Sequence, residues 1–145
     1  MCAAAYQGIK RILVVDDDID LLMLLERRLL KEGYEVETAV SLIEADEIIP
    51  SFLPHLVLLD INLKGADGRQ LCWKLKKIYG DSVKVIIMSG YDYNQVMSVL
   101  FGADDLLAKP IHTDFLLHRI GLHLLPSSKP HHYSWPSGFE GGMST

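Results

Sequence analysis

Several features are missing from this chain, and each absence excludes a class of protein. No apolar run approaches the length of about 20 residues that a membrane-spanning helix needs. The N-terminal residues lack the basic start and apolar core of a secretory signal. Only two of the 145 residues are cysteines, Cys2 and Cys72, and they form no motif, so we expect a reduced, cytoplasmic setting.

The chain also lacks an excess of basic residues. Its 14 Lys and Arg are outnumbered by 19 Asp and Glu, which gives a formal net charge of −5. Nucleic-acid binding requires a positive surface that neutralises phosphates. We therefore expect no direct contact with nucleic acid, and none with membrane. The glycines at 65–68 fit neither of the glycine-rich nucleotide-binding fingerprints.

Apolar runs that end in chemically active side chains are the main feature that is present. Hydrophobic residues make up 49% of the chain, enough for a globular domain. Four runs end in this way, at 16–18 (three aspartates), Asp60, Ser89 and Lys109. Continuous apolar runs are typical of strands buried on both faces of a parallel sheet. Because ligands bind such sheets at the carboxyl ends of the strands, we expect these side chains to converge on one polar site.

Strand and helix patterns alternate five times along the chain. The predicted strands are 11–15, 34–39, 55–60, 83–88 and 105–108, and the predicted helices are 19–32, 41–50, 69–79, 94–101 and 113–125. This alternation predicts a doubly wound α/β fold with a five-stranded parallel sheet. We expect residues 9–125 to form one domain, with a loose leader at 1–8 and a mobile tail at 126–145. Residues 62–68 are predicted to form a loop.

Local signals mark the ends of several helices. Asp18 is the candidate N-cap of the first helix, and Gly33 is placed to end it. Ser41 and Glu44 have the spacing of a capping box for the second helix, and Pro50 is expected to end that helix.

The polar residues at the strand ends suit phosphoryl chemistry. An aspartate such as Asp60 can attack a phosphoryl group and hold it as an acyl phosphate. Asp16 and Asp17 supply the carboxylate oxygens that Mg²⁺ prefers. Clustered carboxylates repel one another, so without metal at least one of them should have a raised pKa. Ser89 can hydrogen-bond a phosphoryl oxygen, and Lys109 supplies a positive charge. Each residue alone is most simply a turn, cap or solvated loop residue, but that interpretation does not explain all four together.

Four motifs carry a resemblance to a known family: VVDD at 14–17, LD at 59–60, MSG at 88–90 and KP at 109–110. In this order and at these spacings they resemble the receiver domain of bacterial two-component response regulators. The resemblance implies the strand order 2-1-3-4-5 and a cis peptide bond before Pro110. It also implies a bound Mg²⁺, held directly by Asp17, Asp60 and the backbone carbonyl of Asn62, with Asp16 acting mainly through water.

The same resemblance implies a function. A sensor histidine kinase or histidine phosphotransfer protein would donate its phosphoryl group to Asp60, and Ser89 would move toward that group. The family usually has an aromatic switch residue three positions before the lysine, where this chain has Leu106. Output to a downstream protein would leave through the face formed by 94–101, 105–108 and 113–125, with a homodimer through that face as an alternative. Such a chain is a switch and not a turnover enzyme.

Two other interpretations stay open on the sequence. The first is a pseudo-receiver, a phosphorylation-independent binding module, which the absence of an aromatic residue at Leu106 favours. The second is a phosphohydrolase of the haloacid dehalogenase type, because Asp18-Ile19-Asp20 resembles its nucleophile and acid pair. Against the second, Asp18 lies beyond the end of the predicted strand, and the glycine and threonine that usually follow are absent.

Overall fold

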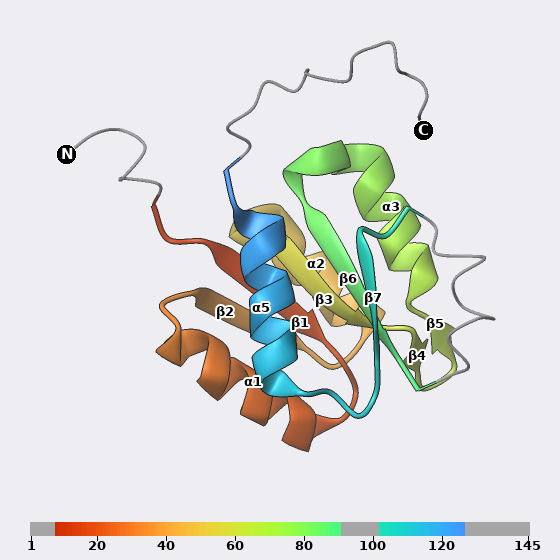
Figure 1. Cartoon of the computed structure of the whole chain (residues 1–145). Coiled ribbons are helices and arrows are strands. Elements are labelled where there is room, and N and C mark those ends of the chain that lie inside the picture. The colour runs from red at the N-terminus through yellow and green to blue at the C-terminus, as the bar shows by residue number, and fades with distance from the viewer. Residues whose placement is uncertain (1–7, 91–101, 127–145) are drawn as a thin grey trace, which may run out of the picture.

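Five parallel strands form the central sheet of the protein. The computed structural model describes residues 8–90 and 102–126. Within these ranges the sheet order is β2-β1-β3-β6-β7 (Figure 1), which confirms the predicted fold and strand order. The strands are β1 (Arg11–Val15), β2 (Glu35–Ala39), β3 (Leu56–Asp60), β6 (Lys84–Ser89) and β7 (Asp105–Ala108). The predicted helix at 94–101, and almost all of the predicted leader and tail, lie outside the described residues.

Helices cover both faces of this sheet. Apolar residues of α1 (Ile19–Lys31) and α5 (Thr113–Leu124) belong to one core cluster, and those of α2 (Leu42–Phe52) and α3 (Arg69–Tyr79) belong to the other (Figure 1). A short 3-10 turn, η2 (Gly80–Ser82), follows α3. Among the described helices, none combines the length and the apolar character needed to cross a membrane.

Residues along the central strands alternate between the two cores. The set that packs under α2 and α3 is Leu13, Val15, Val57, Leu59, Val85 and Ile87. The set that packs under α1 and α5 is Ile12, Val14, Leu56, Leu58, Ile86 and Met88. Because both faces of these strands are covered by helices, both sets are apolar, and the strands read as unbroken apolar runs in the sequence.

The predicted helix caps are present in the structure. The Asp18 side chain accepts a hydrogen bond from the Leu21 N–H at 3.2 Å at the start of α1. Gly33, just beyond α1, has a φ of +99°, a conformation that only glycine adopts at little cost. At α2, Ser41 Oγ accepts from the Glu44 N–H at 3.1 Å. The Glu44 carboxylate in turn accepts from the N–H of Val40, one residue before the cap.

Pro50 does not end α2, so that prediction was wrong. The helix continues to Phe52, and Leu53 caps it in the left-handed region with a φ of 50°. Proline in the last turn removes only one helical hydrogen bond, the one that its N–H would have donated four residues back. That cost is smaller than in the middle of a helix, and the Leu53 N–H still donates to the Ile49 carbonyl at 2.8 Å.

The segment predicted as a loop at 62–68 contains a small hairpin. Strands β4 (Asn62–Leu63) and β5 (Ala66–Asp67) pair antiparallel. Lys64 and Gly65 form the turn between them, with φ values of 26° and 81°. Two positive φ values are typical of the tight turns that join twisted strands. Strands of two residues have no measurable apolar periodicity, which is why the sequence did not indicate them.

Candidate functional site

The carboxyl ends of four strands meet at one edge of the sheet. Asp60 and Ser89 are the last residues of β3 and β6, while Asp16 and Lys109 directly follow β1 and β7. The Lys109 N–H donates to the Ser89 carbonyl at 2.8 Å, which joins the ends of the last two strands. The predicted polar residues therefore share one edge, as expected for a parallel sheet.

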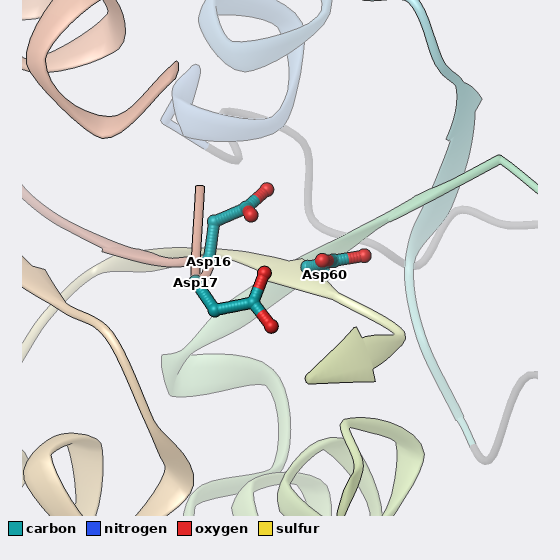
Figure 2. Close-up of side chains that lie close together, drawn as sticks. All are labelled: Asp16, Asp17 and Asp60. Carbon is teal, nitrogen blue, oxygen red and sulfur yellow. The ribbon is translucent and has the colours of Figure 1, made fainter. Parts of the chain in front are cut away.

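Three carboxylates lie together at this edge. Asp16, Asp17 and Asp60 each place one oxygen within 4.8 Å of the others (Figure 2). Asp16 is fully buried and Asp60 is 5% exposed, whereas Asp17 is partly exposed. Buried carboxylates at this distance repel unless a cation lies near them. Three hard oxygen donors with one side open to solvent suit a divalent cation such as Mg²⁺.

Lys109 is the cation that faces this cluster from β7. Its Nζ donates to Asp16 Oδ2 at 2.8 Å and lies 3.4 Å from Asp60 Oδ2. Burial alone would lower the pKa of Lys109, but the hydrogen bond to Asp16 and the charges of Asp60 and Asp16 together raise it. Lys109 is therefore a positive charge held in place between two buried acids. The sequence indicated a phosphoryl partner for Lys109 but not this pairing with Asp16.

Each buried acid divides its two oxygens between its own turn and Lys109. Asp16 Oδ1 accepts the Asp18 N–H at 2.9 Å, and Asp60 Oδ1 accepts the Asn62 N–H at 3.2 Å. Both Oδ2 atoms face Lys109. The backbone bonds orient the carboxylates before any ligand arrives. The ligand role predicted for the Asn62 carbonyl stays a prediction.

The surroundings of Asp60 change the pKa of its carboxyl group. Burial and the negative charge of Asp16 raise its pKa, against the lowering effects of the Asn62 N–H and Lys109. This confirms the prediction that one clustered carboxylate has a raised pKa without metal. A divalent cation beside Asp60 would offset the repulsion and favour the carboxylate, the form that can act as a nucleophile.

Gly68 contributes to the site although no sequence motif singled it out. Its N–H donates to the Ile61 carbonyl at 2.8 Å, immediately before α3 begins. A Cβ atom at this position would overlap the backbone carbonyl oxygen of Asp60. The only sequence signal for this contact is the Asp67-Gly68 pair that follows the hairpin.

The side chains of two other predicted residues are not part of the acid cluster. Leu106 is 7% exposed and belongs to the apolar core under α2 and α3. Asp18 is exposed and caps α1, which is the structural role expected of it and not that of a nucleophile. The structure therefore gives no support to the phosphohydrolase interpretation.

The sheet order and the acid cluster together define a doubly wound α/β domain with a polar site at its switch point. The model of the response regulator receiver domain family matches residues 12–121. The chain belongs to this family of two-component signalling domains, whose members are in general switches and not turnover enzymes. The predicted cis peptide bond between Lys109 and Pro110 is also present.

Solved structures of receiver domains are similar to this chain. A CheY-like receiver domain from Methanospirillum hungatei is 37% identical, with a TM-score of 0.72, covering 79% of this chain and 93% of that one. The response regulator TrrA from Thermotoga maritima, solved in complex with Mg²⁺-BeF, is 33% identical with a TM-score of 0.72, covering 80% and 100%. The BeF3-activated receiver domain of Klebsiella pneumoniae RstA is 32% identical with a TM-score of 0.72, covering 81% and 100%.

Proposed function

We propose that this chain is a phosphorylation-dependent switch whose phosphoacceptor is Asp60. The observation that carries the proposal is the position of Asp60 between an acid pair and a fixed lysine. Its Oδ2 lies 3.4 Å from Lys109 Nζ, and it shares a cluster with Asp16 and Asp17. The Thermotoga maritima relative, solved in complex with Mg²⁺-BeF, supports a metal-assisted phosphoryl site in a chain of this fold.

Mg²⁺ is the proposed cofactor, which Asp17, Asp60 and the backbone carbonyl of Asn62 would hold directly, with Asp16 acting mainly through water. When bound, it supplies positive charge for the oxygens of the transferring group. A carboxylate oxygen of Asp60 forms the bond to phosphorus while the bond from phosphorus to the donor's histidine nitrogen breaks, and the electron pair stays on that nitrogen. Lys109 stabilises the negative charge on the phosphoryl oxygens in the transition state.

The phosphorylated state acts through strands β6 and β7. Ser89, at the end of β6, moves toward the phosphoryl group and donates a hydrogen bond from its hydroxyl to a phosphoryl oxygen. This movement changes an existing equilibrium between two conformers of the domain. Leu106 couples this movement to the core in place of an aromatic residue. Output leaves through the face that includes β7 and α5, toward a downstream protein or a second copy of the chain. The donor is a sensor histidine kinase or a histidine phosphotransfer protein in the cytoplasm.

Intact mass after incubation with acetyl phosphate and Mg²⁺ tests this proposal. We expect one added phosphoryl group on the wild type and none on Asp60→Asn. Asp20→Asn, an exposed acid on α1, is the matched control and should be labelled like the wild type. Equal labelling of wild type and Asp60→Asn would overturn the assignment of Asp60.

A phosphorylation-independent binding module is the second candidate, and Leu106 is the observation that favours it. Its aliphatic side chain is buried in the core and has no ring to change position. If neither acetyl phosphate nor a phosphorylated kinase labels the wild type, while a partner binds wild type and Asp60→Asn equally, this second function is the correct one.

A further inference from the structure

A groove between α2 and α3 lies apart from the acid cluster. It encloses about 620 Å³, within the range of about 300–1,000 Å³ that is usual for binding pockets. Its lining is mainly apolar and comes from the first turns of α2 and the first half of α3: Leu42, Asp46, Gln70, Leu71, Trp73 and Lys74. None of the residues proposed for phosphoryl transfer lines it.

Trp73 is the dominant apolar surface of this groove. Its side chain is 53% exposed, and Lys77 Nζ lies over the indole at 4.8 Å from the ring centroid. With Gln70, Lys74 and Lys77 it shares one face of α3, because these positions are three or four residues apart. Tryptophan is among the residue types most enriched at the centres of protein interfaces. An exposed tryptophan beside a groove therefore indicates a contact surface.

The charge on α3 determines the chemistry of that contact. The helix carries four basic residues and no acidic one. Two of them, Arg69 and Lys76, are ion-paired with Asp67 and Asp104, so the basic residues relevant to the groove are Lys74 and Lys77. Lys74 pairs with Asp46 across the groove at 2.9 Å, and both side chains are about half exposed, at 48% and 47%. Within the described ranges, no acidic side chain forms an ion pair with Lys77. Lys74 thus lines the groove and Lys77 lies over the Trp73 ring. Lys74 is held only by a solvent-exposed and therefore weak ion pair.

We propose that this groove binds an acidic segment of a partner protein. An apolar side chain of that segment packs against Trp73 and Leu42, and its carboxylates pair with Lys74 and Lys77. Asp46 competes with the carboxylates of the partner segment for Lys74, so it lowers the affinity of the groove for that segment. The chain's own residues 127–145 are a poor match in charge, because they contain a single acid, Glu140, and one lysine, Lys129.

Fluorescence of Trp73 in the full-length chain tests the proposal. Trp135→Phe removes the only other tryptophan. The probe is a synthetic peptide in which Asp and Glu residues flank a central Leu-Phe pair. We expect a saturable blue shift of the emission. The dissociation constant should rise about tenfold in Lys74→Glu/Lys77→Glu and fall in Asp46→Asn, because that variant frees Lys74 and removes a competing charge. Replacing Leu-Phe by Ser-Ser in the peptide should weaken binding about tenfold.

Three outcomes would overturn the proposal. The first is no saturable shift with the acidic peptide. The second is that the acidic peptide binds Lys74→Glu/Lys77→Glu as tightly as the wild type, or that a peptide with lysines in place of its acids binds the wild type as tightly as the acidic peptide. The third is a stronger shift with a peptide of residues 127–145 carrying Trp135→Phe, which would make the tail the occupant. Unchanged thermal melting of the variants shows that they fold. The Asp60→Asn chain should bind like the wild type, so this result is separate from the phosphorylation test.

Discussion

Gly68 and Asp60 are in direct backbone contact, with no space between them for a side chain. A Cβ atom at Gly68 would overlap the Asp60 carbonyl oxygen. Gly68 has an ordinary φ of −59°, so its need for glycine comes from this contact and not from backbone conformation. The start of α3 thereby sets the position of the backbone that carries the candidate phosphoacceptor.

Gly68→Ala should therefore reduce both stability and phosphorylation. Overpacking of this kind typically costs about 1–3 kcal/mol, measurable by urea unfolding. The rate of labelling by acetyl phosphate should fall because the Asp60 backbone is displaced. Gly121→Ala in α5 is the matched control: its Cβ meets nothing within 4 Å. Alanine is favoured over glycine in a helix by about 1 kcal/mol, so this control should be stabilised. Equal effects at the two positions would contradict the steric argument.

Removing the charge of Asp60 should stabilise the metal-free protein. Burial and Asp16 raise the pKa of Asp60, which means that its ionised form is disfavoured in the folded state. Asparagine at position 60 keeps a side-chain oxygen that can accept the Asn62 N–H, but it carries no charge. We expect Asp60→Asn to raise the free energy of unfolding by about 1–2 kcal/mol in EDTA.

Mg²⁺ should reverse that order of stability. Binding to the folded state alone stabilises the wild type by mass action, and the effect should be much smaller in Asp60→Asn. Urea unfolding with EDTA and with Mg²⁺ measures both effects, with Asp20→Asn as the exposed control. An Asp60→Asn protein that is less stable than the wild type in EDTA would show that repulsion is not the dominant effect at this position.

Breaking the ion pair between Lys76 and Asp104 should destabilise the protein far more than breaking a surface pair. Its atoms lie 2.9 Å apart, and its side chains are only 15% and 19% exposed. Lys76 Nζ also donates to the Val83 carbonyl at 2.9 Å, and Asp104 Oδ2 accepts the Val85 N–H at 2.8 Å. Asp104→Ala leaves both Lys76 and the Val85 N–H without this partner, so we expect a loss of about 3–5 kcal/mol in urea unfolding.

The Lys74–Asp46 pair provides the matched comparison. Its N–O distance is the same, 2.9 Å, but both side chains are about half exposed. Asp46→Ala should cost no more than about 1 kcal/mol. If the two substitutions destabilise the protein equally, burial does not decide the strength of these pairs.

Elements with strong patterns could be predicted from the sequence. The runs that end at Asp60 and Ser89 are apolar on both faces, so they indicated buried strands and the edge at which they meet. The hairpin that begins at Asn62 could not be predicted, since its strands have two residues each. Pro50 misled because a proline near the end of a helix costs much less than one in the middle.

Part of the candidate site also depended on contacts that no local pattern encodes. Asp16 and Lys109 are far apart in the sequence, and their hydrogen bond exists because β1 and β7 both end at the same edge. The clash that restricts Gly68 arises in the same way, from a tertiary approach to Asp60. Sequence motifs therefore indicated which residues meet, and the fold decided how their atoms pair.

His55 should make stability depend on pH. Its Nδ1 accepts the Arg11 N–H at 2.9 Å, which requires a neutral ring with Nδ1 unprotonated. Burial, and then the charges of Arg11 and Lys10, lower the pKa of His55 below its ordinary 6.5. The unfolded chain thus binds a proton more readily, and stability is lost as the pH falls below about 6.5. At pH 5.5 the loss from this residue is at most about 1.4 kcal/mol.

Comparing wild type with His55→Asn isolates this contribution from that of the other titrating groups. The amide oxygen of asparagine can accept the Arg11 N–H but does not titrate. Urea unfolding at pH 7.5 and 5.5 should show a smaller loss of stability on acidification in the variant. If the two proteins lose the same amount, His55 is protonated in the folded state as easily as in the unfolded chain. The hydrogen bond from Arg11 would then exert no control over its protonation.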